Sequence, residues 1–324
     1  MKIIIMDTNR HANLASGYGT MARALAEGLE RRHHDVYFDS PTLSGNPIID
    51  LISKKKFVDS PDTIYLWTKP PKYVKNENFH QDKKNVFYTM HESETFEGDK
   101  ADWPELLNKC KLIITPTVWN QGVFIKAGVT VPIVVVPLGT DIRFYHPYVA
   151  HDRFNVLTVH EAFGADSSRE NWKMTLEAFN ELFADKTNVN LTVKSWNIKQ
   201  DVVEELRKSG AMDKVTLMSM SIEQGAMASL YQQHFVFLKN SNREGWSIPL
   251  TEAMACGMPV ITYKNPVLEE NVRNYPQVSW FYKKDMLKYY LDYWYKIWRT
   301  SNEYLTMFSW SNTIDRVEDA LETL

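Results

Sequence analysis

The chain has 324 residues, enough for two domains of ordinary size. Hydrophobic residues make up 44% and charged residues 24%, so each half can bury a hydrophobic core. The formal net charge is −3, from 37 basic and 40 acidic residues, and overall electrostatics therefore do not require nucleic acid as a partner.

The two cysteines, Cys110 and Cys256, are too few and too far apart for a disulfide framework, and they show no metal-ligand spacing. No stretch approaches the roughly 20 apolar residues of a membrane span, and the short apolar run after Met1 has no signal-peptide features. The sequence predicts a cytoplasmic protein without a transmembrane segment, and it leaves peripheral membrane contact open.

Short β-rich runs alternate with amphipathic helical patterns along the chain, which is typical of parallel α/β sheets. Met21, Leu25 and Leu29, at four-residue spacing, predict a helix between the first two strands. In the first half, strands are predicted near Ile3–Met6, Val36–Asp39, Ile64–Trp67, Val86–Met90, Leu112–Thr115 and Ile133–Val136.

The pattern restarts after a junction near 144–153. Strands are predicted near Asn155–Val159, Leu191–Lys194, Val215–Met218, Phe235–Leu238, Val260–Tyr263 and Trp280–Tyr282. The two runs predict an α/β protein with two doubly wound, Rossmann-like domains over 1–148 and 149–300, followed by a C-terminal helical segment over 301–324. Ligands of such sheets bind at the carboxyl ends of the strands and at domain interfaces, so we expect the active site in a cleft between the halves.

The most informative stretch begins at Glu244. Pro249 fits the first turn of a helix and Gly257 its C-terminal cap, so 245–248 form the loop that enters the helix. Backbone N–H groups and the helix dipole at that point favour an anion such as a diphosphate. Glu252 is expected in the first turn of the helix, eight residues after Glu244, so that both carboxylates face one ligand.

This stretch, EGWSIPLTEAMACGMPVI, resembles the EX7E signature of retaining GT-B glycosyltransferases, above all glycosyltransferase family 4. Trp246 replaces the usual Phe, and Ser247 replaces a second glycine. The resemblance implies that Glu252 holds the ribose hydroxyls of a nucleotide-sugar donor. It implies that Glu244 and the backbone of Gly245, Trp246, Ser247 and Ile248 hold the sugar. It also implies a GT-B fold in which the segment 301–324 crosses back to the N-terminal domain.

Two cations lie where the family has an Arg or Lys that contacts the donor diphosphate. Arg169 precedes a predicted helix, and Lys194 ends the predicted strand Leu191–Lys194. Preorganised cations stabilise the negative charge that grows on the leaving diphosphate. Lys173, one turn beyond Arg169, is an alternative for the same role.

In the first half, Gly17 and Gly19 lie in a segment that links the first strand to the first helix, where a glycine allows close backbone approach to a ligand. An ordinary tight turn is the alternative, but in the family this loop closes over the donor. His91 follows a predicted strand and is a candidate for contacting the sugar or orienting the acceptor. A lone histidine is more often structural.

No sequence pattern indicates a metal site, and the resemblance implies metal-independent, retaining transfer without a cofactor other than the donor substrate. We name no side-chain nucleophile, because the leaving phosphate is usually described as helping to deprotonate the acceptor. A sugar-nucleotide epimerase of GT-B architecture is an alternative enzyme. A dehydrogenase is disfavoured, because no Gly-x-Gly-x-x-Gly follows the first strand.

The sequence does not identify the acceptor. The family's common acceptors are polysaccharides and lipid-linked glycans. Residues 54–84, however, hold eight lysines against four acids, so a phage-type enzyme that glycosylates a hydroxymethylated DNA base is an alternative. The aromatic run over 289–298 predicts a helix that packs across the domains or lies on a membrane.

Overall fold

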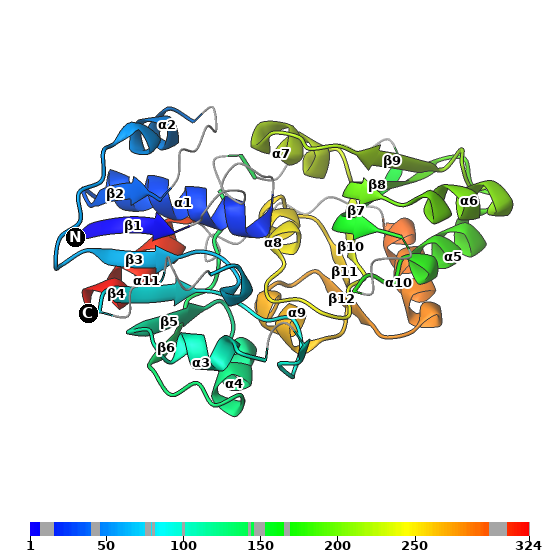
Figure 1. The fold of residues 1–324 in the computed structure, drawn as a ribbon. Coiled ribbons are helices and arrows are strands. Elements are labelled where there is room, and N and C mark those ends of the chain that lie inside the picture. The colour runs from blue at the N-terminus through cyan, green and yellow to red at the C-terminus, as the bar shows by residue number, and fades with distance from the viewer. Residues whose placement is uncertain are drawn as a thin grey trace. The chain divides into compact units, whose positions relative to one another are not determined.

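The computed structural model describes residues 1–6, 16–39, 46–74, 79, 82–98, 101–141, 144–145, 153–164, 169–297 and 310–323. They form two compact units, each built around its own parallel sheet (Figure 1). Unit 1 comprises Met1–Gly139 and Phe308–Leu324, and unit 2 comprises Thr140–Met307. The domain boundaries predicted after 148 and 300 lie outside the described residues.

Unit 1 is a six-stranded sheet in the order β2-β1-β3-β4-β5-β6, with every pair parallel. Its elements are β1 (Lys2–Met6), α1 (Gly17–Arg31), β2 (Asp35–Phe38), α2 (Pro47–Lys54), β3 (Ile64–Trp67), the 3₁₀ turn η1 (Pro71–Tyr73), β4 (Lys84–Tyr88), α3 (Trp103–Leu107), β5 (Leu112–Thr115), α4 (Val118–Lys126), β6 (Ile133–Val135) and α11 (Trp310–Glu322).

The last helix, α11, packs on α1 although the two are far apart in sequence. Gly28 is buried in α1, and a Cβ there would lie 2.7 Å from Cγ1 of Ile314 in α11 and closer still to its Cδ1. Arg32 and His34 pair with Glu318, and Thr313 donates a hydrogen bond to the Pro137 carbonyl at 2.9 Å. The segment that follows the sequence of unit 2 therefore completes unit 1.

Unit 2 is a second parallel sheet, in the order β12-β11-β10-β7-β8-β9. Its elements are β7 (Phe154–Phe163), α5 (Trp172–Phe183), β8 (Val189–Ile198), α6 (Gln200–Ser209), β9 (Val215–Ser219), α7 (Gln224–Gln232), β10 (Val236–Lys239), α8 (Ile248–Ala255), β11 (Val260–Tyr263), α9 (Pro266–Asn271), β12 (Val278–Phe281) and α10 (Lys284–Ile297).

The strand order of unit 2 reverses between β7 and β10. Counted within the unit, the order is that of a Rossmann sheet, and neighbouring connections leave to opposite sides at this reversal. Sheets of this kind bind ligands at the carboxyl ends of the strands beside such a reversal, which here are β7 and β10. Phe154, Val156, Val236 and Leu238 bury the apolar faces of these two central strands in the core.

Each predicted strand is present, and the prediction of two parallel-sheet, Rossmann-like domains is confirmed. The cleft expected between the domains stays a prediction. The predicted ends of two strands were wrong. Lys194 lies within β8, which continues to Ile198, and His160 lies within β7, which continues to Phe163. Both polar side chains are buried, so the apolar pattern stops before the strand does.

Two helix starts also differ from expectation. Gly17 and Gly19 belong to the first turn of α1, where the Ser16 side chain accepts a hydrogen bond from the Gly19 N–H, so they are not a linking loop. Glu252 lies in the second turn of α8 rather than the first, because the helix begins at Ile248. Pro249 does lie in the first turn, and Gly257, with φ of 72°, follows the C-cap as predicted.

Candidate functional site

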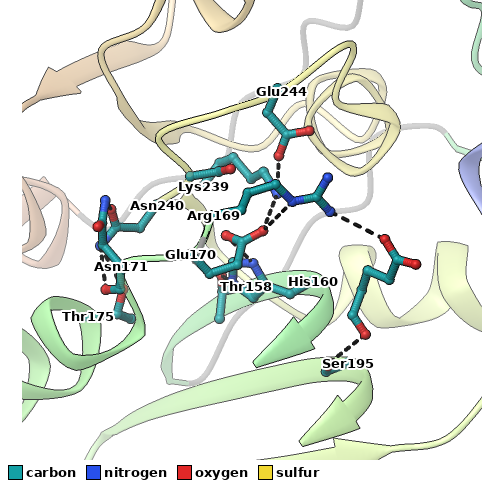
Figure 2. Close-up of polar contacts among 12 residues, drawn as sticks. Thr158, His160, Arg169, Glu170, Asn171, Thr175, Ser195, Lys239, Asn240 and Glu244 are labelled. Carbon is teal, nitrogen blue, oxygen red and sulfur yellow. Dashed lines mark hydrogen bonds and ion pairs between the residues drawn. The ribbon is translucent and has the colours of Figure 1, made fainter. Parts of the chain in front are cut away.

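Charged side chains gather at the strand-order reversal of unit 2, near the carboxyl ends of β7 and β10. His160 comes from β7, Lys239 ends β10, Glu244 follows β10, and Arg169 and Glu170 precede α5 (Figure 2). Their polar atoms form a continuous ion cluster, which we call the β7–β10 cluster and define by these five residues. Four of the five are buried, and Arg169 is partly exposed.

The cluster is held together by four contacts. The Lys239 Nζ lies 2.7 Å from Oε1 of Glu244 and 3.5 Å from Oε1 of Glu170. The Arg169 Nε lies 3.4 Å from the same Glu170 oxygen. On the other side, Nδ1 of His160 lies 2.7 Å from Oε2 of Glu170. Glu170 is therefore the hub, and Glu244 is tied to it through Lys239 (Figure 2).

The electrostatics favour ionised Glu170 and Lys239 with neutral His160. Burial favours the protonated acid of Glu170, but the hydrogen bond from His160 and the charges of Lys239 and Arg169 outweigh it and hold the Glu170 pKa well below its usual range. Burial opposes the charge of Lys239, but Glu170 and Glu244 raise its pKa. Burial lowers the pKa of His160. A neutral ring can donate from Nδ1 to Glu170 and accept at Nε2 from the Thr158 hydroxyl.

Backbone pairing places Arg169 and Glu170 beside the loop that carries Glu244. Glu170 and Ser241 form an antiparallel bridge, and the Asn242 N–H donates to the Arg169 carbonyl at 3.0 Å. The buried Asn240 side chain donates to the Asn171 carbonyl and to the Thr175 hydroxyl, each at 3.0 Å (Figure 2). Two loops that are distant in sequence are thereby fixed as one surface.

The start of α8 has fewer available donors than the sequence suggested. The Ser247 N–H donates to Oδ1 of Asn271 at 3.1 Å, and Pro249 has no N–H. The N–H groups of Leu250 and Thr251 return to the Ser247 carbonyl. Within the described chain, the Ile248 N–H and the buried Ser247 hydroxyl have no partner. An anion at this helix start would meet those two donors and the helix dipole.

Glu252 has a different environment from Glu244. Its Oε2 accepts a hydrogen bond from the Tyr231 hydroxyl at 2.9 Å, and Tyr145 is a second donor. Burial raises the Glu252 pKa to about 7, although both tyrosine hydrogen bonds act in the opposite direction. A carboxylate held by two phenols and ionised near neutral pH is suited to accept hydrogen bonds from ligand hydroxyls.

Lys194 is a cation without a counter-ion in the described part of the chain. It lies on β8, directly opposite Val159 of β7 and next to the pair formed by His160 and Ser195. Its side chain is 7% exposed, and no carboxylate or hydrogen-bond acceptor for its ammonium lies among the described residues. Burial lowers the pKa of this ammonium. A buried cation without a protein anion is suited to bind an anionic ligand.

The candidates in unit 1 form a separate group at the carboxyl edge of its sheet. Tyr18, between Gly17 and Gly19, has its hydroxyl 3.1 Å from the Thr89 hydroxyl and accepts from the Met90 N–H at 3.2 Å. Burial raises the Tyr18 pKa to about 12. His91, the next residue, stacks on Phe96 with ring centroids 4.1 Å apart and donates from Nε2 to the Thr95 carbonyl at 2.8 Å. The structure thus joins the segments of Gly19 and His91.

Sequence reasoning missed Glu170, Lys239, Tyr145 and Tyr231 and did not assign His160. The strongest signal for Lys239 was a charged residue at the end of the apolar run Phe235–Leu238. Glu170 directly follows Arg169, and a carboxylate beside an expected phosphate-binding cation points to an ion pair. Tyr145 and Tyr231 gave no signal, because only the folded unit brings them to Glu252.

Other features bear on the partners. Among the described residues, no group of three or more His, Cys, Asp or Glu side chains is arranged to hold a metal ion. No described helix is long and apolar enough to cross a membrane. Several lysines of 54–84 pair within unit 1: Lys55 with Glu30, Lys83 with Asp59 and Lys84 with Asp62. Asp59 and Asp62 are already counted among the acids of 54–84, so of these three partners only Glu30 offsets part of the excess positive charge.

The predicted helix with the aromatic run is α10, which packs on α5 within unit 2. Lys284 and Lys288 pair with Glu181 of α5, and Trp294 donates to the Ser279 hydroxyl at 2.9 Å. Tyr289 and Tyr293 lie on its exposed side. Trp298 lies outside the described residues.

Comparison with known proteins places these residues in a family context. Residues 162–304 match the protein family described as glycosyl transferases group 1. A curated relative, the serotype-specific mannosyltransferase WbdA of Escherichia coli, is 28% identical over 122 residues. That match covers 37% of this chain and 14% of the relative, so the chain spans only a small part of WbdA.

Solved structures share the fold of both units. HepE of Anabaena in complex with UDP-glucose aligns over 100% of both chains with a TM-score of 0.73 and 14% identity. The pneumococcal O-GlcNAc transferase GtfA, with UDP and GlcNAc, covers 82% of this chain and 57% of its own, with a TM-score of 0.64 and 15% identity. The fold is therefore that of GT-B glycosyltransferases. The match of residues 162–304 to glycosyl transferases group 1 supports the predicted enzyme class.

Proposed function

We propose that the chain is a retaining, metal-independent glycosyltransferase that moves a sugar from a nucleoside diphosphate sugar to an acceptor hydroxyl. The observation that carries the proposal is the β7–β10 cluster at the strand-order reversal of unit 2. There a buried carboxylate, Glu244, pairs with a buried cation, Lys239, and precedes the start of α8 in the chain. The complexes of HepE with UDP-glucose and of GtfA with UDP support this class of donor.

The residues divide into three binding roles. Lys194 and Arg169 bind the diphosphate, together with the Ile248 N–H and the Ser247 hydroxyl at the start of α8. Glu244 accepts a hydrogen bond from the donor sugar. Glu252 accepts hydrogen bonds from the ribose. Gly245 and Trp246 line the sugar side, and Gly17, Gly19 and His91 contribute from unit 1.

Transfer breaks the bond between the anomeric carbon and the phosphate oxygen. The bonding electron pair leaves with the nucleoside diphosphate, where cations and N–H donors stabilise the added charge. The acceptor oxygen bonds to the anomeric carbon from the same face, and its proton passes to the departing phosphate oxygen. No side-chain nucleophile is required, and the configuration at the anomeric carbon is kept.

A donor screen by thermal unfolding tests the proposal. We expect one nucleotide and its sugar, among UDP, GDP, ADP and their glucose, N-acetylglucosamine and mannose forms, to raise the melting temperature of the wild type in EDTA. Lys194→Met should abolish the rise, because it removes the cation that lacks a protein anion. Lys288→Met, in the partly exposed ion pair between α10 and Glu181 of α5, is the matched control and should keep it. No stabilisation by any nucleotide would contradict the donor site.

The stereochemical part of the proposal has its own test. Proton NMR of the wild type with the identified donor and a panel of glycan and glycolipid acceptors follows the anomeric signals. We expect a product with the donor's anomeric configuration. A product of opposite configuration would exclude retention, and a donor inverted at C2 without transfer would indicate an epimerase.

A further inference from the structure

We infer that Lys239 is a positioning residue for Glu244: its ammonium occupies one carboxylate oxygen and leaves the other for a single hydroxyl of the donor sugar. The inference rests on the proposed function, because it assumes that Glu244 meets the sugar. It adds Lys239, which the sequence did not indicate, to the residues of the site. It also limits Glu244 to accepting from one hydroxyl of the sugar.

The two oxygens of Glu244 are not equivalent. Oε1 lies 2.7 Å from the Lys239 Nζ in a pair whose members are only 2% and 6% exposed. Oε2 accepts no hydrogen bond from the described residues. A carboxylate ordinarily accepts at both oxygens. Here one oxygen is occupied by the protein, so the carboxylate can receive a ligand hydroxyl at the other.

Lys239 is anchored firmly enough to orient its partner. It ends β10, a central strand paired with β7 on one side and β11 on the other, and it lies opposite Thr262 of β11. Its ammonium is held on the far side by Glu170, at 3.5 Å. Sites built on strands and supported by buried partners hold side chains in a narrow range of geometry. Glu244 itself lies on a loop, so its orientation depends on such a partner.

Other cations of the cluster do not take this role. The ion pairs described for Arg169 run to Glu161 and Glu170, whereas Lys239 contacts Glu244 directly. A buried ammonium is costly unless anions surround it, and an apolar residue would continue the strand Val236–Lys239 at lower cost. Its presence at that position is explained if the ammonium serves the neighbouring carboxylate.

Titration calorimetry tests the inference through the sugar's share of donor affinity. The probes are UDP against UDP-glucose, UDP against UDP-N-acetylglucosamine, and GDP against GDP-mannose. The pair with the largest wild-type ratio of nucleotide Kd to nucleotide-sugar Kd is used. We call this ratio the sugar gain. It measures how much the sugar adds to the affinity, separately from the contacts to the nucleotide.

Two matched variants separate positioning from folding. Lys288→Met, which removes an ammonium from an ion pair with Glu181 outside the cluster, serves as the control. Lys239→Met combined with Glu170→Gln removes the ammonium and one anion together, so the net charge of the cluster is unchanged and folding is protected. We expect the control to keep the sugar gain. We expect the double variant to lower the sugar gain about tenfold, which is the usual contribution of a hydrogen bond to a charged group. The Kd for the free nucleotide should stay unchanged.

A Glu244→Gln background completes the test. If Lys239 acts through Glu244, its removal in that background has no further effect on the sugar gain. A double variant that keeps the sugar gain, or that weakens free nucleotide and nucleotide sugar equally, overturns the inference and leaves the proposed function intact. A wild type that binds nucleotides with no sugar gain in any pair overturns the sugar site itself, and this inference with it.

Discussion

Under the proposed function, Glu252 serves ribose binding at a cost to stability. Tyr231 and Tyr145 donate to its carboxylate, yet burial still raises its pKa to about 7. The folded pKa lies above the ordinary value, so the folded chain favours the protonated acid. This contribution to stability is fully present below the ordinary pKa and is lost as the pH rises through about 7.

Replacing Glu252 by Gln should therefore raise stability at pH 8 and leave it nearly unchanged at pH 4. The gain expected at pH 8 is on the order of 1–3 kcal/mol, because the amide keeps an acceptor for the tyrosines and carries no charge. Thermal unfolding at both pH values measures it. An equal change at pH 4 and pH 8 would show that ionisation of Glu252 is not the cause.

The same substitution should remove a pH dependence of nucleotide affinity. Under the proposed function the ribose hydroxyls donate to Glu252, and a carboxylate is a stronger acceptor than the neutral acid, so wild-type affinity should rise, by up to about tenfold, between pH 6 and pH 8. The Glu252→Gln variant should bind the nucleotide more weakly than the wild type at pH 8. Its affinity should depend on pH only through ionisation of the nucleotide's phosphate. Titration calorimetry with the nucleotide from the donor screen measures both proteins.

At the scale of elements, Gly28 permits the contact between α1 and α11. A methyl group at this position would overlap Ile314, so Gly28→Ala should destabilise the protein by about 1–3 kcal/mol, although alanine is the better helix former. Gly122 in α4 has open space around its missing Cβ, so Gly122→Ala should instead stabilise by about 0.5–1 kcal/mol. Chemical denaturation of both variants checks the difference. If both variants are stabilised, α11 does not pack on Gly28 in solution.

The strands and helix ends could be predicted wherever apolar pattern and turn residues agree. Pro249 and Gly257 marked the limits of α8 well, and all the predicted strands are present. The pattern failed at His160 and Lys194, where buried polar side chains continue a strand beyond its apolar run. Such side chains are accommodated by tertiary partners, or by a ligand, that a local pattern does not contain.

The residues of the candidate site likewise divide into those that the sequence predicted and those that only the fold reveals. The carboxylates of the motif and Arg169 were found from their order along the chain. Glu170 and Lys239 were not, because their role depends on backbone pairing between Ser241 and Glu170 and on the reversal of strand order. Contacts between loops that are 70 residues apart follow from the fold and not from spacing.

For the whole molecule, the proposed function concentrates donor recognition in unit 2. The family match over residues 162–304 lies within that unit, as do Arg169, Lys194, Lys239, Glu244 and Glu252. Unit 1 carries the segments of Gly19 and His91, joined through Tyr18. This division predicts that substitutions in the β7–β10 cluster and at Lys194 or Glu252 weaken donor binding more than substitutions at Gly19 or His91.

The measurement that tests this account most directly is a crystal structure with the nucleotide sugar from the donor screen bound. We predict the diphosphate against Lys194, Arg169 and the start of α8, with one sugar hydroxyl on Oε2 of Glu244 and the ribose on Glu252. A nucleotide bound away from the β7–β10 cluster, or a diphosphate that leaves Lys194 without an anion, would contradict the assignment of the donor site.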